Sequence, residues 1–319
     1  MSQRVVYFNG EFVPESEARV SIFDSALMFG DMAFEMTRTF GGTSFRLREH
    51  LERLYASLKL MEIDCGLTID EMESATEDTL ERNRPTETDD VDWQIMHDVS
   101  RGPLPPYRCL FPDGLTPTVI INCWPLLTHT APMAEAYDSG VNVVIVSQLA
   151  LPAHLLDAKA KTRSRLHYRM AALQGGRSGD HTWPVMLDPD GFLAEGPGWN
   201  VLLVKNGELF SPEPRNILLG VSRDTTMQLA GKLGIPVHET NLGRYEALAA
   251  DEILLTTTPA SMLRAATFEG QMVGDGGPGP VYQKLMDAWK QEVGIDFVAQ
   301  ARDYAARLGQ WEKDQQSGA

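Results

Sequence analysis

The sequence has few cysteines and no long apolar run. Its 319 residues include three cysteines, Cys65, Cys109 and Cys123, and this odd number with wide spacing excludes both a disulfide framework and a C-x-x-C zinc site. No segment approaches the roughly 18 continuous apolar residues that would span a bilayer, and no apolar stretch follows a basic start at the N-terminus. These absences predict a cytoplasmic protein of a reducing compartment, with no membrane partner.

Basic residues are also scarce. The chain carries 28 Lys and Arg against 44 Asp and Glu, a formal net charge of -16, and 43% of its residues are hydrophobic. A surface that binds a phosphate backbone needs clustered Lys and Arg, so nucleic acid is not an expected partner. The length is about twice that of a typical domain of roughly 150 residues, which predicts two domains.

Several common catalytic motifs are missing. The seven histidines show no i, i+4 pair, so no metal site is expected, and neither G-x-S-x-G nor a Walker A sequence occurs. One G-x-G-x-x-G match, Gly274 to Gly279, contains Pro278 and has no βαβ pattern around it, which predicts a loop.

The first 123 residues read as a small domain of strands and helices. Asn9-Gly10 between two β-branched and aromatic runs predicts a hairpin. Apolar residues at steps of three or four from Leu47 to Met61 predict an amphipathic helix, and Thr68-x-x-Glu71 predicts a capping box that starts another. A loop over 82–90 and strands over 91–100 and 118–123 complete the domain.

Residues 124–134 lack a sustained period and are the expected linker to a larger domain over 135–319. Short strand patterns with turn signals between them are typical of a barrel-like or sandwich domain. Helices are expected near Ser222 and near Pro280, the second continuing into a frayed, charged tail. The expected strands lie at 141–146, 184–187, 201–204 and 252–257.

Four separated pieces of the sequence carry a family resemblance. They read FGDMAFEMTRTF from Phe29, FRLREHLERL from Phe45, KTRSRLHYRMA from Lys161 with AEGPGWNVLLV from Ala194, and LGVSRD from Leu219 with DEILLTTTPASM from Asp251. In order and spacing they resemble the class IV aminotransferases, the fold-type IV enzymes that use pyridoxal 5'-phosphate (PLP). The resemblance implies an α/β (α+β) protein with a small N-terminal α/β domain and a larger C-terminal pseudo-barrel domain.

PLP chemistry requires a lysine that links covalently to the cofactor and then moves protons at the substrate's α-carbon. The resemblance assigns this role to Lys161. Lys159 is the rival, but the 34 residues from Lys161 to Glu195 fit the family's spacing better.

The remaining cofactor contacts are also implied by the resemblance. Glu195, in an E-G-x-G-x-N pattern that Asn200 completes, matches the carboxylate at the pyridine nitrogen, which keeps the ring protonated. Arg53 matches the phosphate arginine, and a helix N-terminus supplies N–H groups. The further phosphate contacts are Val221, Ser222, Thr257 and Thr258.

The substrate residues depart from any one subgroup. Met36 replaces a usual glycine in FEMTR, and the Tyr-x-Arg motif of the branched-chain enzymes is missing. Leu166 stands where a tyrosine near the cofactor's 3-hydroxyl is usual, so Arg165 or Tyr168 is a candidate replacement. Arg108 is the first candidate for the substrate carboxylate and Arg38 the second. The expected substrate-binding residues are Phe34, Arg38, Trp93 and Arg108.

The resemblance implies a homodimeric aminotransferase that moves an amino group from an amino acid or amine to a 2-oxo acid by a ping-pong mechanism. The apolar stretch Leu27-Met28-Phe29 is a candidate dimer contact. Two alternatives stay open at this point: a lyase of the aminodeoxychorismate type, and a PLP-fold protein that binds a small molecule without turnover. The amino donor is open between branched-chain amino acids, apolar D-amino acids and (R)-amines.

Overall fold

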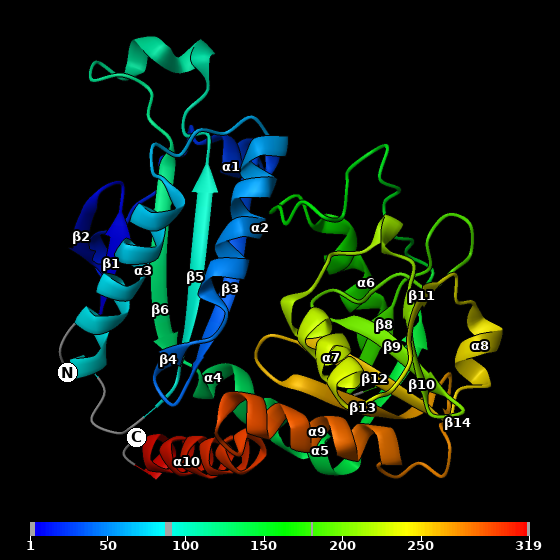
Figure 1. Ribbon diagram of the computed structural model, residues 1–319. Coiled ribbons are helices and arrows are strands. Elements are labelled where there is room, and N and C mark those ends of the chain that lie inside the picture. Colours follow the sequence, from blue (N-terminus) through cyan, green and yellow to red (C-terminus); the bar gives the residue numbers. More distant parts are fainter. Residues whose placement is uncertain (1–3, 87–90, 180, 318–319) are drawn as a thin grey trace. The chain divides into compact units, whose positions relative to one another are not determined.

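The computed structural model describes residues 4–86, 91–179 and 181–317 and divides into two compact units (Figure 1). The N-terminal unit comprises Met1–Leu126 and Ala160–Arg165, and the C-terminal unit comprises Leu127–Lys159 and Leu166–Ala319. Each unit has its own sheet, which confirms the predicted α/β class. The short return of the chain over Ala160–Arg165 places Lys161 in the N-terminal unit.

The N-terminal unit is built on an antiparallel sheet with the strand order β2-β1-β6-β5-β3-β4. The predicted hairpin is confirmed, since β1 and β2 pair around Asn9-Gly10, where both residues adopt positive φ. The strands of this sheet are β1 (Val5–Phe8), β2 (Glu11–Pro14), β3 (Met32–Phe40), β4 (Thr43–Ser44), β5 (Trp93–Ser100) and β6 (Thr118–Pro125).

Helices pack on the sheet of the N-terminal unit, with α2 against β3 and α3 against β1 and β6 (Figure 1). The capping box at Thr68 is confirmed, because its hydroxyl accepts from Glu71 N while Glu71 accepts from Thr68 N. The helix that follows continues to Asn83 and ends in a 3₁₀ turn, so the predicted loop begins too early, and residues 87–90 lie outside the described part. The helical elements are η1 (Glu15–Glu17), α1 (Ser25–Phe29), α2 (Leu47–Leu60), α3 (Ile69–Asn83), η2 (Arg84–Thr86) and η3 (Pro105–Leu110).

The C-terminal unit contains a mixed eight-stranded sheet with the order β11-β10-β9-β12-β13-β7-β8 and β14 paired to β13. Hairpins join some neighbours, as expected, but β10 with β11, β13 with β7 and β7 with β8 run parallel. Helix α6 connects β7 to β8, and α7 lies in the connection from β10 to β11. The strands are β7 (Val141–Ile145), β8 (Thr182–Val185), β9 (Asn200–Lys205), β10 (Glu208–Pro212), β11 (Val237–Thr240), β12 (Glu252–Thr257), β13 (Ser261–Phe268) and β14 (Gln271–Met272).

The last helical region differs from the prediction. The helix that starts at Pro280 does not run on into the tail, because Gly294 adopts a left-handed conformation and caps it, and a separate helix follows. That helix, α10, packs on α4 and α5 of the same unit. The helical elements are α4 (Leu127–Thr130), η4 (Ala131–Met133), α5 (Ala134–Ser139), α6 (Leu166–Gly176), η5 (Pro214–Asn216), α7 (Val221–Lys232), α8 (Arg244–Leu248), α9 (Pro280–Val293) and α10 (Phe297–Ser317).

The segment 124–134, expected as a linker, has regular structure. Trp124 and Pro125 end β6, and α4 and η4 follow directly.

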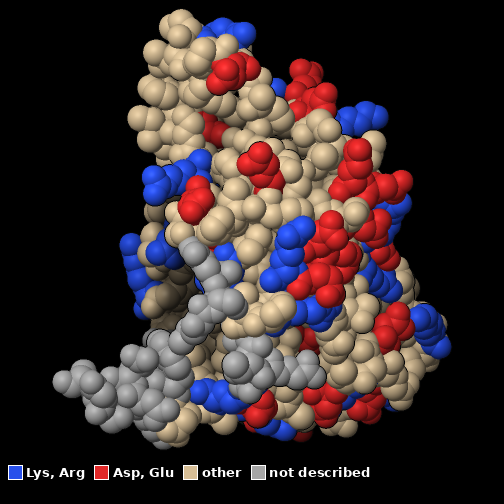
Figure 2. Space-filling view, turned by 90° about the vertical axis from the view of Figure 1, so that its left-hand side faces the viewer, with Lys and Arg blue, Asp and Glu red and all other residues tan. Residues whose placement is uncertain are grey.

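The predicted loop at Gly274–Gly279 is confirmed, since it connects β14 to α9 and Gly279 is the N-cap of that helix. On the face of the molecule shown in Figure 2, acidic and basic side chains are interspersed.

Candidate active site

Lys161 is held at the edge of β3 in the N-terminal unit. Its carbonyl accepts from Phe34 N at 2.9 Å, and Arg163 N donates to Met32 O at 2.8 Å, so the segment pairs with the strand. The Lys161 ammonium nitrogen lies 4.7 Å from the centre of the Phe34 ring. Lys159, by contrast, is exposed and forms an ion pair with Asp157 at 3.4 Å. The geometry therefore distinguishes a lysine built into a sheet edge from a surface lysine.

Arg53 projects from α2 toward β3 and is joined to a buried carboxylate. Its Nε donates to Glu35 Oε1 at 2.6 Å and its Nη2 to Glu35 Oε2 at 2.8 Å. The arginine side chain is 13% exposed and Glu35 is fully buried. Two parallel hydrogen bonds from one guanidinium edge restrict its orientation strongly.

The pairing of β3 with β5 sorts the expected substrate residues onto two faces. Side chains alternate along a strand, so Phe34, Met36 and Arg38 share one face with their partners on β5, Asp98, Met96 and Gln94. Trp93 is one residue out of phase with that set, is 2% exposed and belongs to the opposite, helix-covered face. The structure therefore does not bring Trp93 together with Phe34. The β5 residues on the Phe34 face were not considered from the sequence, although strand alternation was the available signal.

The two arginines expected at the substrate carboxylate differ in accessibility. Arg38 is 1% exposed, stacks over the Phe40 ring at 3.8 Å and has Asp92 Oδ2 3.7 Å from its Nη2. Arg108 lies in η3, is exposed within its unit and donates to Phe111 O at 3.0 Å. A buried arginine beside an aspartate is a poorer carboxylate receptor than an exposed one, so Arg108 is the better candidate of the two.

Glu195 is the centre of a buried polar cluster in the C-terminal unit. It is 3% exposed, and its Oε2 accepts from Asn200 Nδ2 at 3.0 Å and from Leu218 N at 2.9 Å. Its Oε1 accepts a short hydrogen bond from the Tyr168 hydroxyl. Gly196 is required here because a Cβ would lie 1.9 Å from Trp199 Nε1.

The start of α7 lies beside the same cluster. Asn200, which holds Glu195, also donates to Leu218 O at 2.9 Å just before the helix, and the N-cap residue Gly220 supplies no side chain to the first turn. Val221 and Ser222, the first two residues of the helix, are 9% and 8% exposed. The N–H groups of this turn point out of the helix end and attract anions.

The end of β12 completes the cluster. Asn200 opposes Thr256 in the β9–β12 ladder, and Thr257 Oγ1 donates to Gly198 O at 2.8 Å. Thr258 follows the strand and is half-buried, and Thr256 Oγ1 is buried without a hydrogen-bond partner among the described residues. Four segments of the sequence thus meet within one unit: the E-G-x-G-x-N turn, the L-G-V-S turn, the T-T-T run and Tyr168 on α6.

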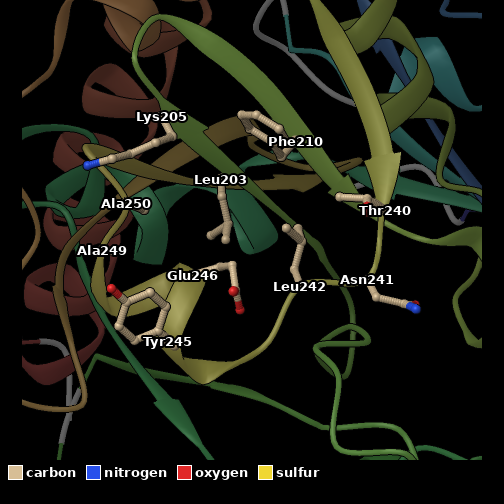
Figure 3. A pocket seen from close by; sticks show the side chains of 10 residues that line it. All are labelled: Leu203, Lys205, Phe210, Thr240, Asn241, Leu242, Tyr245, Glu246, Ala249 and Ala250. Carbon is tan, nitrogen blue, oxygen red and sulfur yellow. The ribbon is translucent and has the colours of Figure 1, made fainter.

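A cavity of about 400 Å³ lies elsewhere in the C-terminal unit (Figure 3). Residues of β9, β10 and α8 line it, among them Leu203, Phe210 and Tyr245, and none of the residues predicted from the sequence does.

Within the described residues no cluster of three or more His, Cys, Asp or Glu side chains could hold a metal ion. Among those same residues, no helix has the length and apolar character needed to cross a membrane.

Comparison with known proteins identifies the class to which this fold and site belong. The family model for amino-transferase class IV matches residues 32–268. The chain is 34% identical to a putative branched-chain-amino-acid aminotransferase of Methanocaldococcus jannaschii over 89% of its length and 95% of the relative's. It is 28% identical to D-alanine aminotransferase of Bacillus licheniformis, over 90% of its length and 96% of the relative's.

A solved structure agrees with the sequence relatives. The PLP form of the branched-chain amino acid aminotransferase of Thermobaculum terrenum superposes with a TM-score of 0.78 at 25% identity and covers 95% of this chain and 97% of that one. The two-sheet α/β fold with its Glu195 cluster is thus the fold of a PLP-dependent transferase. The chain belongs to the class IV aminotransferases, is an aminotransferase, and uses PLP.

The residues present fit this cofactor. A buried carboxylate with three hydrogen-bond donors is available for the protonated pyridine nitrogen, and a helix N-terminus next to a threonine run is available for the phosphate. The N-terminal unit offers a lysine and an arginine on neighbouring elements.

Proposed function

We propose that Lys161 is the catalytic lysine of this aminotransferase. Bound PLP supplies an electron sink for the negative charge that develops at the substrate's α-carbon. With PLP bound, the Lys161 amine would accept the proton that leaves the substrate's α-carbon and would donate it again to complete transfer of the amino group. The observation that supports this role is the pairing of the Lys161 segment with β3, which holds the amine over the Phe34 ring.

Glu195 holds the proton on the pyridine nitrogen in this proposal. The hydrogen bonds that the Glu195 carboxylate accepts from Asn200 Nδ2 and Leu218 N orient it and stabilise a negative charge. The negative charge of Glu195 then favours a positively charged ring nitrogen. Tyr168, whose hydroxyl already donates to Glu195, orients the carboxylate, so we assign it to this contact and not to the cofactor's 3-hydroxyl.

The phosphate is bound by charge and by N–H groups. Arg53 supplies the positive charge, and the first turn of α7 supplies the N–H groups of Val221 and Ser222. Thr257 already donates its hydroxyl to Gly198 O, so Thr258 is the better candidate for a hydroxyl contact and Thr257 for a main-chain contact.

The substrate is an amino acid with an apolar side chain, and the acceptor is a 2-oxo acid. Phe34 and Met36 share the sheet face beside Lys161 and offer apolar contact surface, and Arg108 binds the α-carboxylate. The named functions of the relatives, which act on branched-chain amino acids and D-alanine, agree with an apolar side chain. The two half-reactions follow one another by a ping-pong mechanism.

A panel of donors tests this assignment. L-valine, L-leucine, L-isoleucine, D-alanine and an (R)-amine are assayed against 2-oxoglutarate and pyruvate, and apolar amino acids are expected to be the fastest donors. Arg108→Ala should raise the KM for the 2-oxo acid about tenfold or more while the visible cofactor spectrum stays unchanged. An unchanged KM would remove Arg108 from the site.

The active form is a homodimer in this proposal. Ile22, Leu27 and Phe29 are 73%, 69% and 66% exposed in the N-terminal unit, and a second copy of the chain would cover them. The protein acts in the cytoplasm, which agrees with three cysteines that form no disulfide. Size-exclusion chromatography with light scattering tests the first statement, and cell fractionation tests the second.

A further inference from the structure

A carboxylate with no exposure to solvent lies next to the proposed phosphate arginine. Glu35 is 0% exposed and projects from β3 onto the helix-covered face, where it accepts the forked pair of hydrogen bonds from Arg53. Burying an ion pair removes two charges from water, and replacing such pairs by apolar residues often leaves stability unchanged or raises it. Folding stability alone therefore does not account for a fully buried glutamate at this position.

Glu35 has further partners that define its orientation. His50, 2% exposed on α2, places Nδ1 2.8 Å from Glu35 Oε2, and Met36 N donates to the same oxygen at 3.2 Å. Arg53 and His50 hold the pKa of Glu35 well below its usual range although burial opposes this, and burial lowers the pKa of His50. Glu35 is thus ionised, and His50 is neutral and donates through Nδ1.

The charges of this group nearly cancel. Glu35 offsets the charge of Arg53 and a neutral His50 adds none, so Glu35 itself does not strengthen the electrostatic attraction of Arg53 for an anion. Its effect on Arg53 is geometric: the Nε–Nη2 edge of the guanidinium is used by Glu35, which sets the direction of the Nη1 side. An anion that binds Arg53 would therefore meet a side chain whose orientation is already determined.

The same turn of α2 also contacts the segment that carries the catalytic lysine. Ser57, 1% exposed, donates from Oγ to Arg53 O at 2.9 Å and accepts from Lys161 N at 3.1 Å. On the strand side, Phe34 N donates to Lys161 O, one residue before Glu35. On β3, Glu35 thus contacts Arg53 and the neighbouring Phe34 contacts the Lys161 main chain. On α2, Ser57 contacts the main chain of both Arg53 and Lys161.

We infer that Glu35 and Ser57 are positioning residues, and that Glu35 with His50 orients Arg53 toward the phosphate while Ser57 sets the position of Lys161 relative to the same helix turn. The inference rests on the proposed roles of Arg53 and Lys161. Neither Glu35 nor Ser57 touches the cofactor or the reacting atoms in this proposal. Their effect is to maintain the distance between Lys161, which would link covalently to the cofactor, and Arg53, which would bind the phosphate of the same cofactor.

The first test separates phosphate binding from all other binding. Cofactor-depleted protein is titrated with PLP and, separately, with pyridoxal, which lacks the phosphate. Glu35→Gln should raise the Kd for PLP about tenfold or more and leave the Kd for pyridoxal within about twofold, because the forked contact to Arg53 is lost. Glu52→Gln, which makes the same charge change at the exposed residue before Arg53, is the matched control and should change neither Kd.

Other outcomes of this titration overturn the role of Glu35. An unchanged Kd for PLP means that Arg53 needs no partner, and a lower Kd means that Glu35 only reduces the charge of Arg53. Glu35→Asp keeps the charge but shortens the side chain, and should weaken PLP binding as Glu35→Gln does. It also provides the measurement if Glu35→Gln does not fold. If Arg53→Ala leaves the ratio of the two dissociation constants unchanged, the proposed role of Arg53 itself fails, which is a different result from a failure of the glutamate variants alone.

The second test addresses Ser57. The rate at which the borohydride-reducible adduct forms after PLP is added should fall about tenfold in Ser57→Ala, because Lys161 N loses its acceptor and the segment shifts. Ser57→Thr keeps the hydroxyl and should restore most of the rate. A wild-type rate in Ser57→Ala, or a Ser57→Thr variant as slow as Ser57→Ala, would overturn the role of the hydroxyl. The thermal midpoint of each cofactor-depleted variant reports whether the fold is intact.

Discussion

Lys161 and Lys159 show how two equal side chains acquire different properties from their surroundings. Lys159 is exposed and forms an ion pair with Asp157 at 3.4 Å, a surface contact in which both side chains remain in water. Lys161 lies on a sheet edge against an aromatic ring with Arg163 over the same ring at 4.0 Å. Contacts with an aromatic ring and a sheet edge thus surround Lys161, whereas the ion pair of Lys159 lies at the surface.

Exchange of each lysine for alanine tests this difference. Lys161→Ala should lose the borohydride-reducible cofactor adduct and lower the transamination rate at least about a thousandfold, since both the covalent link and the proton carrier are removed. Lys159→Ala is the control and should keep both. Mass spectrometry of the reduced protein locates the adduct, and an adduct on Lys159 would reverse the assignment.

His97 is a second residue whose surroundings determine its chemistry. It is fully buried on β5, and its Nε2 shares a hydrogen bond with Thr76 Oγ1 at 2.8 Å. Burial lowers its pKa to about 4, with His50 acting in the same direction and Glu35 against it. The unfolded chain binds a proton at His97 below about pH 6.5, whereas the folded chain does not until about pH 4.

This difference predicts a loss of stability in acid. Because the unfolded state takes up the proton first, the free energy of unfolding should fall as the pH drops from about 6.5 to about 4, by at most roughly 3 kcal/mol from this residue. His97→Gln should flatten the fall over that window. Denaturant midpoints measured at several pH values compare the two proteins, and parallel curves would show that His97 does not titrate on unfolding.

At the scale of elements, α7 and β9 are joined through one side chain. Asn200 at the start of β9 holds Glu195 and the carbonyl of Leu218, and a Cβ on Gly220 would lie 2.1 Å from Asn200 Oδ1. Gly220 has φ -67, which any residue can adopt, so the glycine is needed for space and not for its backbone conformation. The N-terminus of the helix therefore approaches the carboxylate cluster only because this position lacks a side chain.

Gly220→Ala should displace Asn200 and weaken the support of Glu195. We expect a loss of about 1 kcal/mol, or roughly 2–4 °C in Tm, together with a several-fold higher Kd for PLP. Gly231→Ala in the same helix is the matched control, because nothing lies within 4 Å of its added Cβ and alanine favours a helix. If the two variants had the same Tm and the same Kd for PLP, the displacement of Asn200 would affect neither stability nor cofactor binding.

At the scale of the whole molecule, the exposed apolar side chains around α1 are the feature that a single chain does not explain. Ile22 and Leu27 are more than two thirds exposed, and together with Phe29 they form a run of apolar side chains within ten residues. Isolated apolar residues on a surface are ordinary, but such a run in an acidic protein is typical of an interface.

Charge placed in this run tests the proposed dimer. Ile22→Asp combined with Leu27→Asp should shift the mass found by light scattering from dimer to monomer and lower activity at least about tenfold, since burying two carboxylates is costly. Met272→Asp, at a 72% exposed position on β14 of the C-terminal unit, is the control. A double variant that remains dimeric would place the interface elsewhere.

The sequence by itself determined the family and those helices and strands that have strong local signals. The hairpin at Asn9-Gly10, the helix from Leu47 and the capping box at Thr68 all follow from interactions within a few residues, so local chemistry was sufficient. Helix α6 was missed because Leu166, Met170 and Leu173 are exposed while Ala171 and Gly175 are buried, so its apolar period gave no usable pattern. The end of α9 was missed because one left-handed glycine, Gly294, decided it.

Only the tertiary structure decided which candidate residues come together. Strand register set Trp93 on the face opposite Phe34. Burial beside Asp92 distinguishes Arg38, the second candidate from the sequence, from the exposed Arg108, which was the first. The partners of Arg53 and of Lys161, Glu35 and Ser57, lie 18 and 104 residues away along the chain. Such pairs are a property of packing between elements, which residue types and spacing do not encode locally. The proposed roles of Lys161 and Glu195, by contrast, come from motifs that lie within short stretches of the sequence and resemble those of the family.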